Sequence, residues 1–142
     1  MKDVYVTIPL EPKPKLRPRF SVVRGRVFTH TPYETKEFEN KVAALYLNKT
    51  KGGMFERHRP LQVKITFLME IPKSFTKKKC ADIECGLLLH TVKPDLDNLT
   101  KSVLDALNGI AWYDDAQIVN LQVNKQYSAG SGQITLHIKE MG

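Results

Sequence analysis

Two acidic clusters, separated by one helical pattern, constrain the fold of this chain most strongly. The first lies in residues 93–101 (KPDLDNLTK) and the second in residues 112–117 (WYDDAQ). Between them, apolar residues recur every three or four positions, which predicts a helix that buries one face and ends at Asn108–Gly109. The apolar positions are Leu96, Leu99, Val103, Ala106, Leu107 and Ile110. One acidic cluster therefore starts this helix, and the other lies close to its end.

The first cluster holds more acids than helix capping requires. Pro94 can open the helix, because its missing N–H would be unsatisfied there anyway. Asp95, Asp97 or Asn98 could then cap the first turn, and one of them would suffice. Lys101 lies one turn after Asp97, where it can pair with Asp97 or stand beside whatever Asp97 binds.

The second cluster leads into a predicted strand, because residues 116–123 alternate between polar and apolar. If this strand packs against the helix, Asp115 can fold back towards Asp95 and Asp97. Three carboxylates held together repel one another, which raises their pKa values unless a cation neutralises them. Carboxylates on rigid elements suit Mg²⁺, so the pattern indicates a magnesium site of the kind that acts on phosphates.

Charge is divided unevenly along the chain, whose formal net charge is +7. Residues 1–79 hold 18 Lys and Arg against 7 Asp and Glu, while residues 80–142 hold 4 against 8. A basic half joined to an acidic half fits a polyanion that one part holds and the other cuts, or binds through a metal. A solvated basic surface without a partner is the alternative.

The overall pattern predicts a single domain over residues 1–142 in a soluble, cytoplasmic protein. No apolar run approaches the roughly 20 residues of a membrane helix, so we expect no membrane partner. Cys80 and Cys85 would point to different faces of a helix, and with His90 they lack a fourth zinc ligand. The glycine-rich segment 128–132 lacks a phosphate-loop pattern, so we expect no nucleotide cofactor.

Basic segments predict where DNA would be held. In residues 13–21 (KPKLRPRFS) the prolines impose an extended backbone with its cations in solvent, which favours an arm that follows phosphates. A basic loop without a partner is the alternative. A short helix capped by Ser74 carries further lysines, which are either a solvated face or a second backbone contact. The expected DNA-binding residues are Lys15, Arg17, Arg19, Lys77, Lys78 and Lys93.

The remaining patterns predict an α+β fold, with a mixed or antiparallel sheet and helices mainly on one face. A helix is expected to start with Thr31 as N-cap and Pro32 at its first position, and to stop by Gly52. Its buried stripe is predicted at Phe38, Val42, Leu45 and Tyr46. The predicted strands are residues 4–9, a pair turning near Gly25 within residues 22–28, a central strand at residues 61–69, and a hairpin formed by residues 116–127 and 134–138.

These motifs resemble those of the RusA family of Holliday junction resolving endonucleases, which is common in phages and prophages. The resemblance is carried by residues 93–101, 104–109 (LDALNG) and 112–119 (WYDDAQIV), with support from Pro18–Arg19–Phe20 and Thr31–Pro32. The Asp-x-Asp-Asn pattern, followed after a helix by Trp-x-Asp-Asp-Ala-Gln, is long enough to distinguish this family from a chance match.

This resemblance implies catalytic, metal-binding acids at Asp95, Asp97 and Asp115 and an important lysine at Lys101. It also implies a homodimer that uses Mg²⁺ or Mn²⁺ to nick two opposed strands of a four-way junction. Asp114 would assist the reaction or simply start the turn. One acid could accept the proton of the attacking water, while Lys101 would steady charge on the phosphate or orient the water.

Two other classes of protein share parts of this pattern. PD-(D/E)xK nucleases place their acids and lysine on strands, whereas here Asp97 and Lys101 share a helical turn. A non-catalytic nucleic-acid-binding module of a phage or prophage would use the acids only to cap a helix and shape a turn. That would leave Asp97 and one of Asp114 and Asp115 without a task, so we predict a metal-dependent endodeoxyribonuclease.

Overall fold

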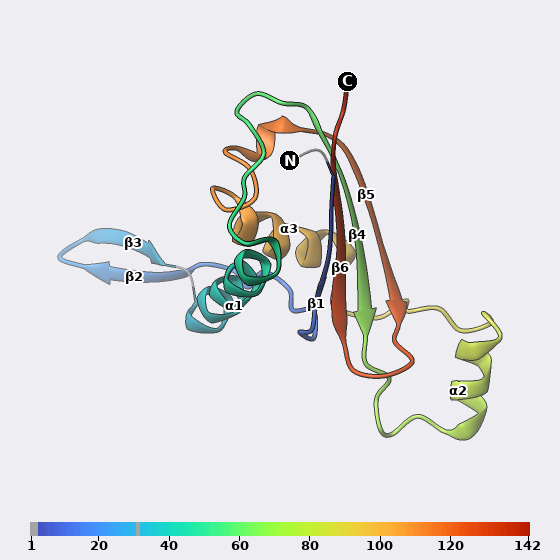
Figure 1. The fold of residues 1–142 in the computed structure, drawn as a ribbon. Coiled ribbons are helices and arrows are strands. Elements are labelled where there is room, and N and C mark those ends of the chain that lie inside the picture. Colours follow the sequence, from blue (N-terminus) through green and yellow to red (C-terminus); the bar gives the residue numbers. More distant parts are fainter. Residues whose placement is uncertain (1–2, 31) are drawn as a thin grey trace.

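The computed structural model describes residues 3–30 and 32–142. Figure 1 shows a twisted sheet with two helices on one face, a hairpin projecting to one side and a short helix beyond one end of the sheet. The elements are β1 (Asp3–Ile8), β2 (Arg19–Val23), β3 (Arg26–His30), α1 (Tyr33–Thr50), β4 (Leu61–Met69), α2 (Lys77–Glu84), α3 (Leu96–Leu107), the 3₁₀ turn η1 (Asp115–Gln117), β5 (Ile118–Tyr127) and β6 (Gln133–Glu140). The predicted α+β fold is confirmed.

The main sheet has the strand order β1-β6-β4-β5, with β4 antiparallel to β6 and parallel to β5. Every second residue of β4, from Leu61 to Met69, is buried, because these side chains face α1 and α3. The predicted central position of β4 is confirmed. None of the helices in the described ranges combines the length and the apolar character needed to cross a membrane.

The predicted hairpin between residues 116–127 and 134–138 is wrong. Both segments are strands, but β4 lies between them, so β6 pairs with β4 and β1 instead of β5. Alternation in a sequence identifies which side chains face the core, but it does not identify the neighbouring strand. β4 buries every second side chain along its 9 residues and takes the place between them, where both of its edges are paired.

The helical stripes were predicted correctly, whereas the helix starts were not. α1 buries Phe38, Val42 and Tyr46, and α3 buries four members of its predicted stripe: Leu99, Val103, Ala106 and Leu107. α3 begins at Leu96 and not at Pro94, because Asp95 still has an extended backbone with ψ 144°. α1 begins at Tyr33 with Pro32 at the N-cap position. Thr31, the predicted cap, lies outside the described residues.

The cap of α2 also differs from the prediction. Thr76 caps this helix, since its hydroxyl accepts a hydrogen bond from the Lys79 N–H at 3.2 Å. Ser74 lies instead in the preceding turn, which the bond from the Phe75 N–H to the Pro72 carbonyl closes at 3.0 Å. A serine already engaged in a turn cannot provide the extended backbone that an N-cap requires.

Strands β2 and β3 pair only with each other and project away from the sheet as a hairpin (Figure 1). The two residues at its tip, Arg24 and Gly25, both have positive φ values of 51° and 76°, as a tight two-residue hairpin turn requires. The predicted turn near Gly25 is confirmed. Large apolar side chains on both strands are exposed, with Phe20 at 71% and Val22 at 70%.

Candidate active site

A cavity of about 670 Å³ lies between α3 and β5. Asp97, Lys101 and Asp105 follow one another every four residues, so their side chains lie along one line of α3 and reach this cavity. Asp115 lines the same cavity from η1, and two apolar residues of β5, Leu121 and Val123, line it as well. The structure thus brings together Asp97, Lys101 and Asp115, three residues singled out from the sequence.

Asp95 occupies a different position. It is the N-cap residue of α3, its side chain is exposed and makes no capping hydrogen bond, and it is not among the residues that line the cavity. Within residues 3–30 and 32–142, no three His, Cys, Asp or Glu side chains are close enough together to hold a metal ion. The carboxylates therefore share a cavity without forming a closed coordination shell.

Asp115 is held by two contacts from the preceding turn. The fully buried Trp112 donates its indole N–H to Asp115 Oδ1 at 2.6 Å, and the Asp115 N–H donates to Asn108 Oδ1 at 3.1 Å. Burial raises the pKa of Asp115, and the charges of Asp105 and Asp114 raise it further, while the Trp112 hydrogen bond opposes the shift. The net result is a raised pKa, so this carboxylate favours a proton or a cation beside it.

Its neighbours in the acidic motif build the turn. Asp114 Oδ1 accepts a hydrogen bond from the Ala116 N–H at 3.0 Å, which caps η1. The buried side chain of Gln117 completes the capping box, because its Oε1 accepts from the N–H groups of Tyr113 at 2.9 Å and Asp114 at 3.1 Å. Asp114 therefore starts the turn, and the turn directs Asp115 into the cavity.

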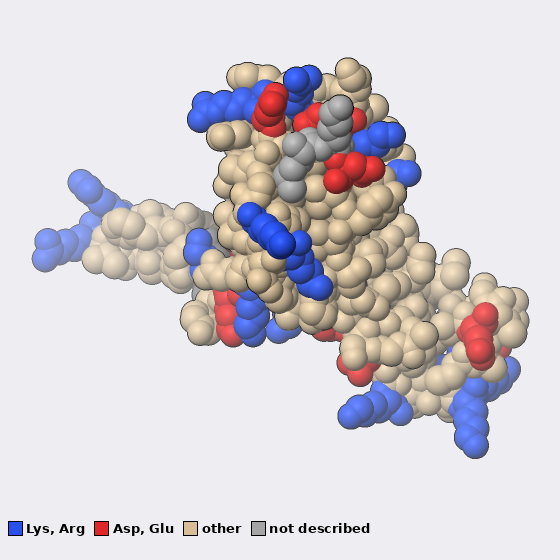
Figure 2. Space-filling model, in the orientation of Figure 1, with Lys and Arg blue, Asp and Glu red and all other residues tan. Residues whose placement is uncertain are grey.

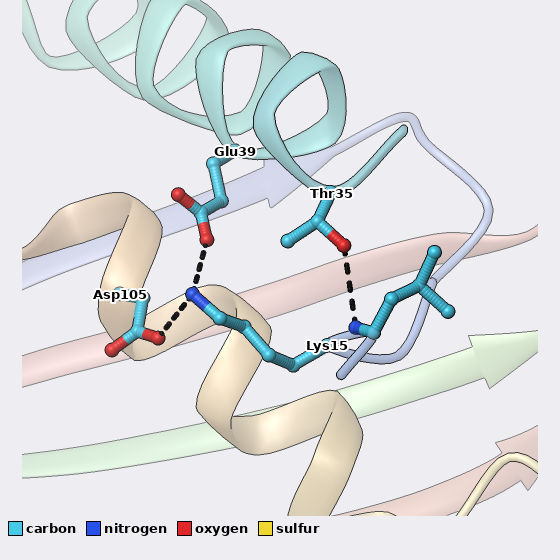
Figure 3. Close-up of polar contacts among 5 residues, drawn as sticks. Lys15, Thr35, Glu39 and Asp105 are labelled. Atoms are coloured by element: carbon cyan, nitrogen blue, oxygen red, sulfur yellow. Dashed lines mark hydrogen bonds and ion pairs between the residues drawn. The ribbon is translucent and has the colours of Figure 1, made fainter. Parts of the chain in front are cut away.

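Lys15 ties the basic N-terminal segment to both helices (Figure 3). Its Nζ lies 2.8 Å from Glu39 Oε1 of α1 and 2.7 Å from Asp105 Oδ2 of α3. Burial lowers the pKa of Lys15, but these two carboxylates outweigh that effect and leave its pKa above the usual value. Next to it, the Leu16 N–H donates to Thr35 Oγ1 at 3.2 Å. The ammonium group expected to bind DNA is thus already held by two carboxylates.

The other predicted DNA-binding residues lie around the rim of the molecule. Arg17 is exposed just before β2, Lys77 and Lys78 are exposed in the first turn of α2, and Lys93 is exposed before α3. The side chain of Arg19 lies outside the described residues. Figure 2 shows Lys and Arg at the end of the hairpin and around α2, two projections separated by the body of the protein, which carries further Lys and Arg.

Two residues of the site were missed from the sequence. Asp105 lines the cavity and follows Lys101 by four residues, a spacing that places both on one side of a helix. Lys125 donates from Nζ to the carbonyls of Val92 at 2.7 Å and Pro94 at 2.9 Å, which fixes the segment leading into α3. The signal was available, because Lys125 is a lone cation at an inward-facing position of a predicted strand.

The chain is similar to a known family of proteins. The family model described as Endodeoxyribonuclease RusA matches residues 9–139. The YqaN protein of Bacillus subtilis strain 168 is 37% identical over 128 residues, which cover 90% of each chain.

Two relatives carry the name crossover junction endodeoxyribonuclease RusA. The protein of Enterobacteria phage 82 is 32% identical and that of Escherichia coli strain K12 is 31% identical, each over 143 aligned positions that cover all of this chain and 98% of the relative. The resemblance seen in the sequence motifs is confirmed, and with it the prediction of an endodeoxyribonuclease. This chain belongs to the RusA family of endodeoxyribonucleases.

Proposed function

We propose that this protein resolves four-way DNA junctions as a homodimer, by paired nicks that depend on Mg²⁺. The observation that carries the proposal is the shared cavity, which Asp97, Lys101 and Asp115 all line. Asp97 is the second residue of α3, so the rest of that helix lies between the two acids in the sequence. The family provides endodeoxyribonuclease activity, and relatives matched over the whole chain are named for crossover junctions.

The donor set of the cavity fits Mg²⁺. Asp105 is paired with Lys15 and Asp115 accepts a bond from Trp112, while Asp97 has no ion pair or side-chain hydrogen bond within the described ranges. Mg²⁺ keeps several waters and uses few protein carboxylates, so an open set of acids suits it. Asp97 and Asp115 would hold the ion, and Mn²⁺ could replace Mg²⁺. Asp95, which does not line the cavity, is proposed as a third ligand from the family motif alone.

Bound Mg²⁺ would polarise the scissile phosphate and lower the pKa of a water molecule. The side chains have separate tasks. The ammonium group of Lys101, in the same cavity, stabilises the negative charge that builds on the phosphate oxygens. One of the cavity carboxylates accepts the proton of the attacking water. Trp112 fixes the orientation of the Asp115 carboxylate through its indole N–H.

DNA is held by the two basic projections. The β2–β3 hairpin is a two-stranded ribbon, a shape that the major groove of DNA admits, and Arg24 and Arg26 lie at its tip. Arg17 precedes the hairpin and Arg19 begins β2, while Lys77, Lys78 and Lys93 contact the DNA backbone elsewhere. A four-way junction has two-fold symmetry, so two coordinated nicks require two active sites related by a dyad, which a homodimer supplies.

The test is cleavage of a mobile and a fixed synthetic junction, with Mg²⁺ or with EDTA, mapping every nick. We expect symmetric paired nicks in Mg²⁺ and none in EDTA. Asp97→Asn should lower the cleavage rate by roughly 10³-fold, as expected for a lost catalytic charge. Its affinity should stay the same or rise, since a negative charge facing phosphate is removed.

Asp82→Asn, which removes an acid on α2, is the matched control and should cleave normally. Unchanged cleavage by Asp97→Asn would remove this residue from the active site. If the protein binds the four-way junction tightly but makes no nick in Mg²⁺ or Mn²⁺, it is a non-catalytic DNA-binding module, which is the rival interpretation of the sequence.

A further inference from the structure

A second cavity, of about 580 Å³, lies on the other side of the turn that carries Asp115. Asp114 lines this second cavity, and the adjacent Asp115 lines the cavity between α3 and β5. Two consecutive residues of one turn therefore face the two cavities. The other walls of the second cavity include Arg57, His58 and Tyr113. A DNA strand whose phosphate reaches Asp115 would therefore pass over or beside this second cavity, since nucleotides follow one another at about 3.4 Å along a strand.

The walls of the second cavity are fixed in place by one buried amide. Gln117, only 8% exposed, donates from Nε2 to the carbonyls of Glu56 at 2.8 Å and Arg59 at 3.1 Å. The Oε1 atom of the same side chain accepts from the N–H groups of Tyr113 and Asp114. This amide joins two segments more than fifty residues apart, so the cavity is preformed and needs no ligand to assemble it.

Arg57 and Tyr113 form a stacked pair at this cavity. The guanidinium carbon of Arg57 lies 4.5 Å from the centre of the Tyr113 ring, and the Tyr113 side chain is 46% exposed. Arg57 has no carboxylate within ion-pair distance in the described part of the chain, whereas Arg59, two residues later, pairs with Glu56 at 3.1 Å. The pair thus offers flat surface and an unneutralised positive charge to the same ligand.

A nucleotide combines the two properties that this surface would recognise. An aromatic ring and a guanidinium plane both stack on nucleobases, and the guanidinium also binds phosphate. A duplex hides the faces of its bases, while a branch point exposes some of them. The cavity next to the cleavage site therefore suits an unpaired base with its phosphate.

We propose that Arg57 and Tyr113 bind an unpaired nucleotide next to the scissile phosphate and help to select where the strand is cut. The proposal rests on the proposed function for the link between this cavity and the nick. Binding itself needs no cleavage. The two residues act as specificity determinants, and they hold no metal and transfer no proton.

The first measurement follows base stacking in the absence of cleavage. A junction carries 2-aminopurine on either side of the expected nick and is bound by the Asp97→Asn protein. We expect fluorescence to be quenched at one of the two positions, because the base stacks on Tyr113. The quench should disappear when Tyr113→Ala is added and stay when Tyr33→Ala, which removes an exposed tyrosine of α1, is added instead.

The second measurement follows nick positions on a mobile junction. Tyr113→Ala and Arg57→Ala should each lower the preference for the main site by about fivefold or more, the scale of one lost stacking contact. Tyr113→Phe, which keeps the ring, should retain the preference of the wild type, and so should Arg59→Ala. Thermal unfolding checks that each variant is folded, and Arg57→Ala provides the test if Tyr113→Ala is not.

The two proposals fail in different ways. If the wild type nicks the junction but neither Tyr113→Ala nor Arg57→Ala changes the site preference or the quench, the nucleotide site is wrong. If the wild type does not nick any junction, the proposed function fails, while a quench that depends on Tyr113 still supports nucleotide binding.

Discussion

The acidic cavity and the β2–β3 hairpin are built in opposite ways. In the cavity, Asp105 and Asp115 are partly buried and held by Lys15 and Trp112, while Asp97 and Lys101 are exposed but stand on the core-packed helix α3. In the hairpin, Arg24 and Arg26 form no ion pair within the described residues, and the strands pair only with each other. An isolated two-stranded hairpin has little stability of its own in water.

Under the proposed function, this difference separates two tasks. Catalysis needs carboxylates held in fixed positions, so they belong on elements that the core supports. Binding an extended polyanion needs free cations on a segment that can reach it, so they belong on a projection. We therefore expect substitutions in the cavity region to change stability and cleavage, and substitutions in the hairpin to change DNA affinity alone.

The largest effect is expected for Trp112→Phe. Trp112 is fully buried, so the smaller ring leaves space in the core and should lower the free energy of unfolding by roughly 2 kcal/mol. Asp115 also loses its indole donor, so cleavage should fall even where the protein is folded. Urea unfolding and single-turnover cleavage measure both effects. Phe28→Leu in the hairpin is the control. A loss of stability as large as that of Trp112→Phe would show that the hairpin contributes as much to folding as the cavity region does.

The next effect concerns the hairpin tip. Replacing Arg24 and Arg26 together by alanine should weaken junction binding by about tenfold at moderate salt. The slope of log K against log salt should become shallower by about 2, since each lost phosphate contact contributes about 0.9. The melting temperature should stay within about 1 °C of the wild type, because neither side chain contacts the core. An unchanged salt slope would show that the hairpin tip does not touch DNA.

A smaller effect is expected for Lys15→Met, which tests to which region Lys15 belongs. The substitution leaves Glu39 and Asp105 without the cation that they share, so the unfolding free energy should fall by about 1 kcal/mol. Junction affinity should change little. Arg17→Met, on the exposed side of the same segment, should do the reverse. If Lys15→Met weakened junction binding as much as Arg17→Met and left stability unchanged, Lys15 would be a DNA-binding residue.

The smallest effect is a pH dependence at Asp115. Its pKa is raised in the folded protein, so the folded state binds the proton more strongly than the unfolded state does. Below the ordinary pKa of aspartate, both states are protonated and Asp115 costs no stability. Between that pKa and the raised pKa of the folded state, stability falls as the pH rises. Asp115→Asn avoids this loss and should melt slightly higher than the wild type at pH 7 in EDTA. The difference should vanish at low pH, and one that persists unchanged there would exclude this cause.

The sequence was most informative where one residue pattern answers one question. The three-to-four spacing located the buried stripes of α1 and α3, and alternation located β4 as a half-buried strand. The pairing of β5 with β6 was predicted wrongly, because alternation identifies a strand but not its neighbour, and the fit of both strands to β4 decides the order. Helix starts were displaced by one or two residues, since several capping residues stand in a row at each start.

Within the candidate site, residue type identified Asp97, Lys101 and Asp115, which do line one cavity. The partner of Lys15 could not be predicted, because Glu39 and Asp105 lie 24 and 90 residues away in the sequence. A run of cations indicates a basic segment, but only the packing of that segment shows which cation is neutralised. The role of Asp95 stays a prediction from the family motif.

The most direct test of the account is thermal unfolding of the DNA-free protein as Mg²⁺ is added. If Asp97 and Asp115 hold the ion, a concentration ten times its Kd should raise the wild-type Tm by roughly 4 °C. Asp97→Asn and Asp115→Asn should each lose most of that rise, while Asp82→Asn keeps it. Equal rises in the wild type and in both cavity variants would contradict the claim that these two acids share one divalent cation.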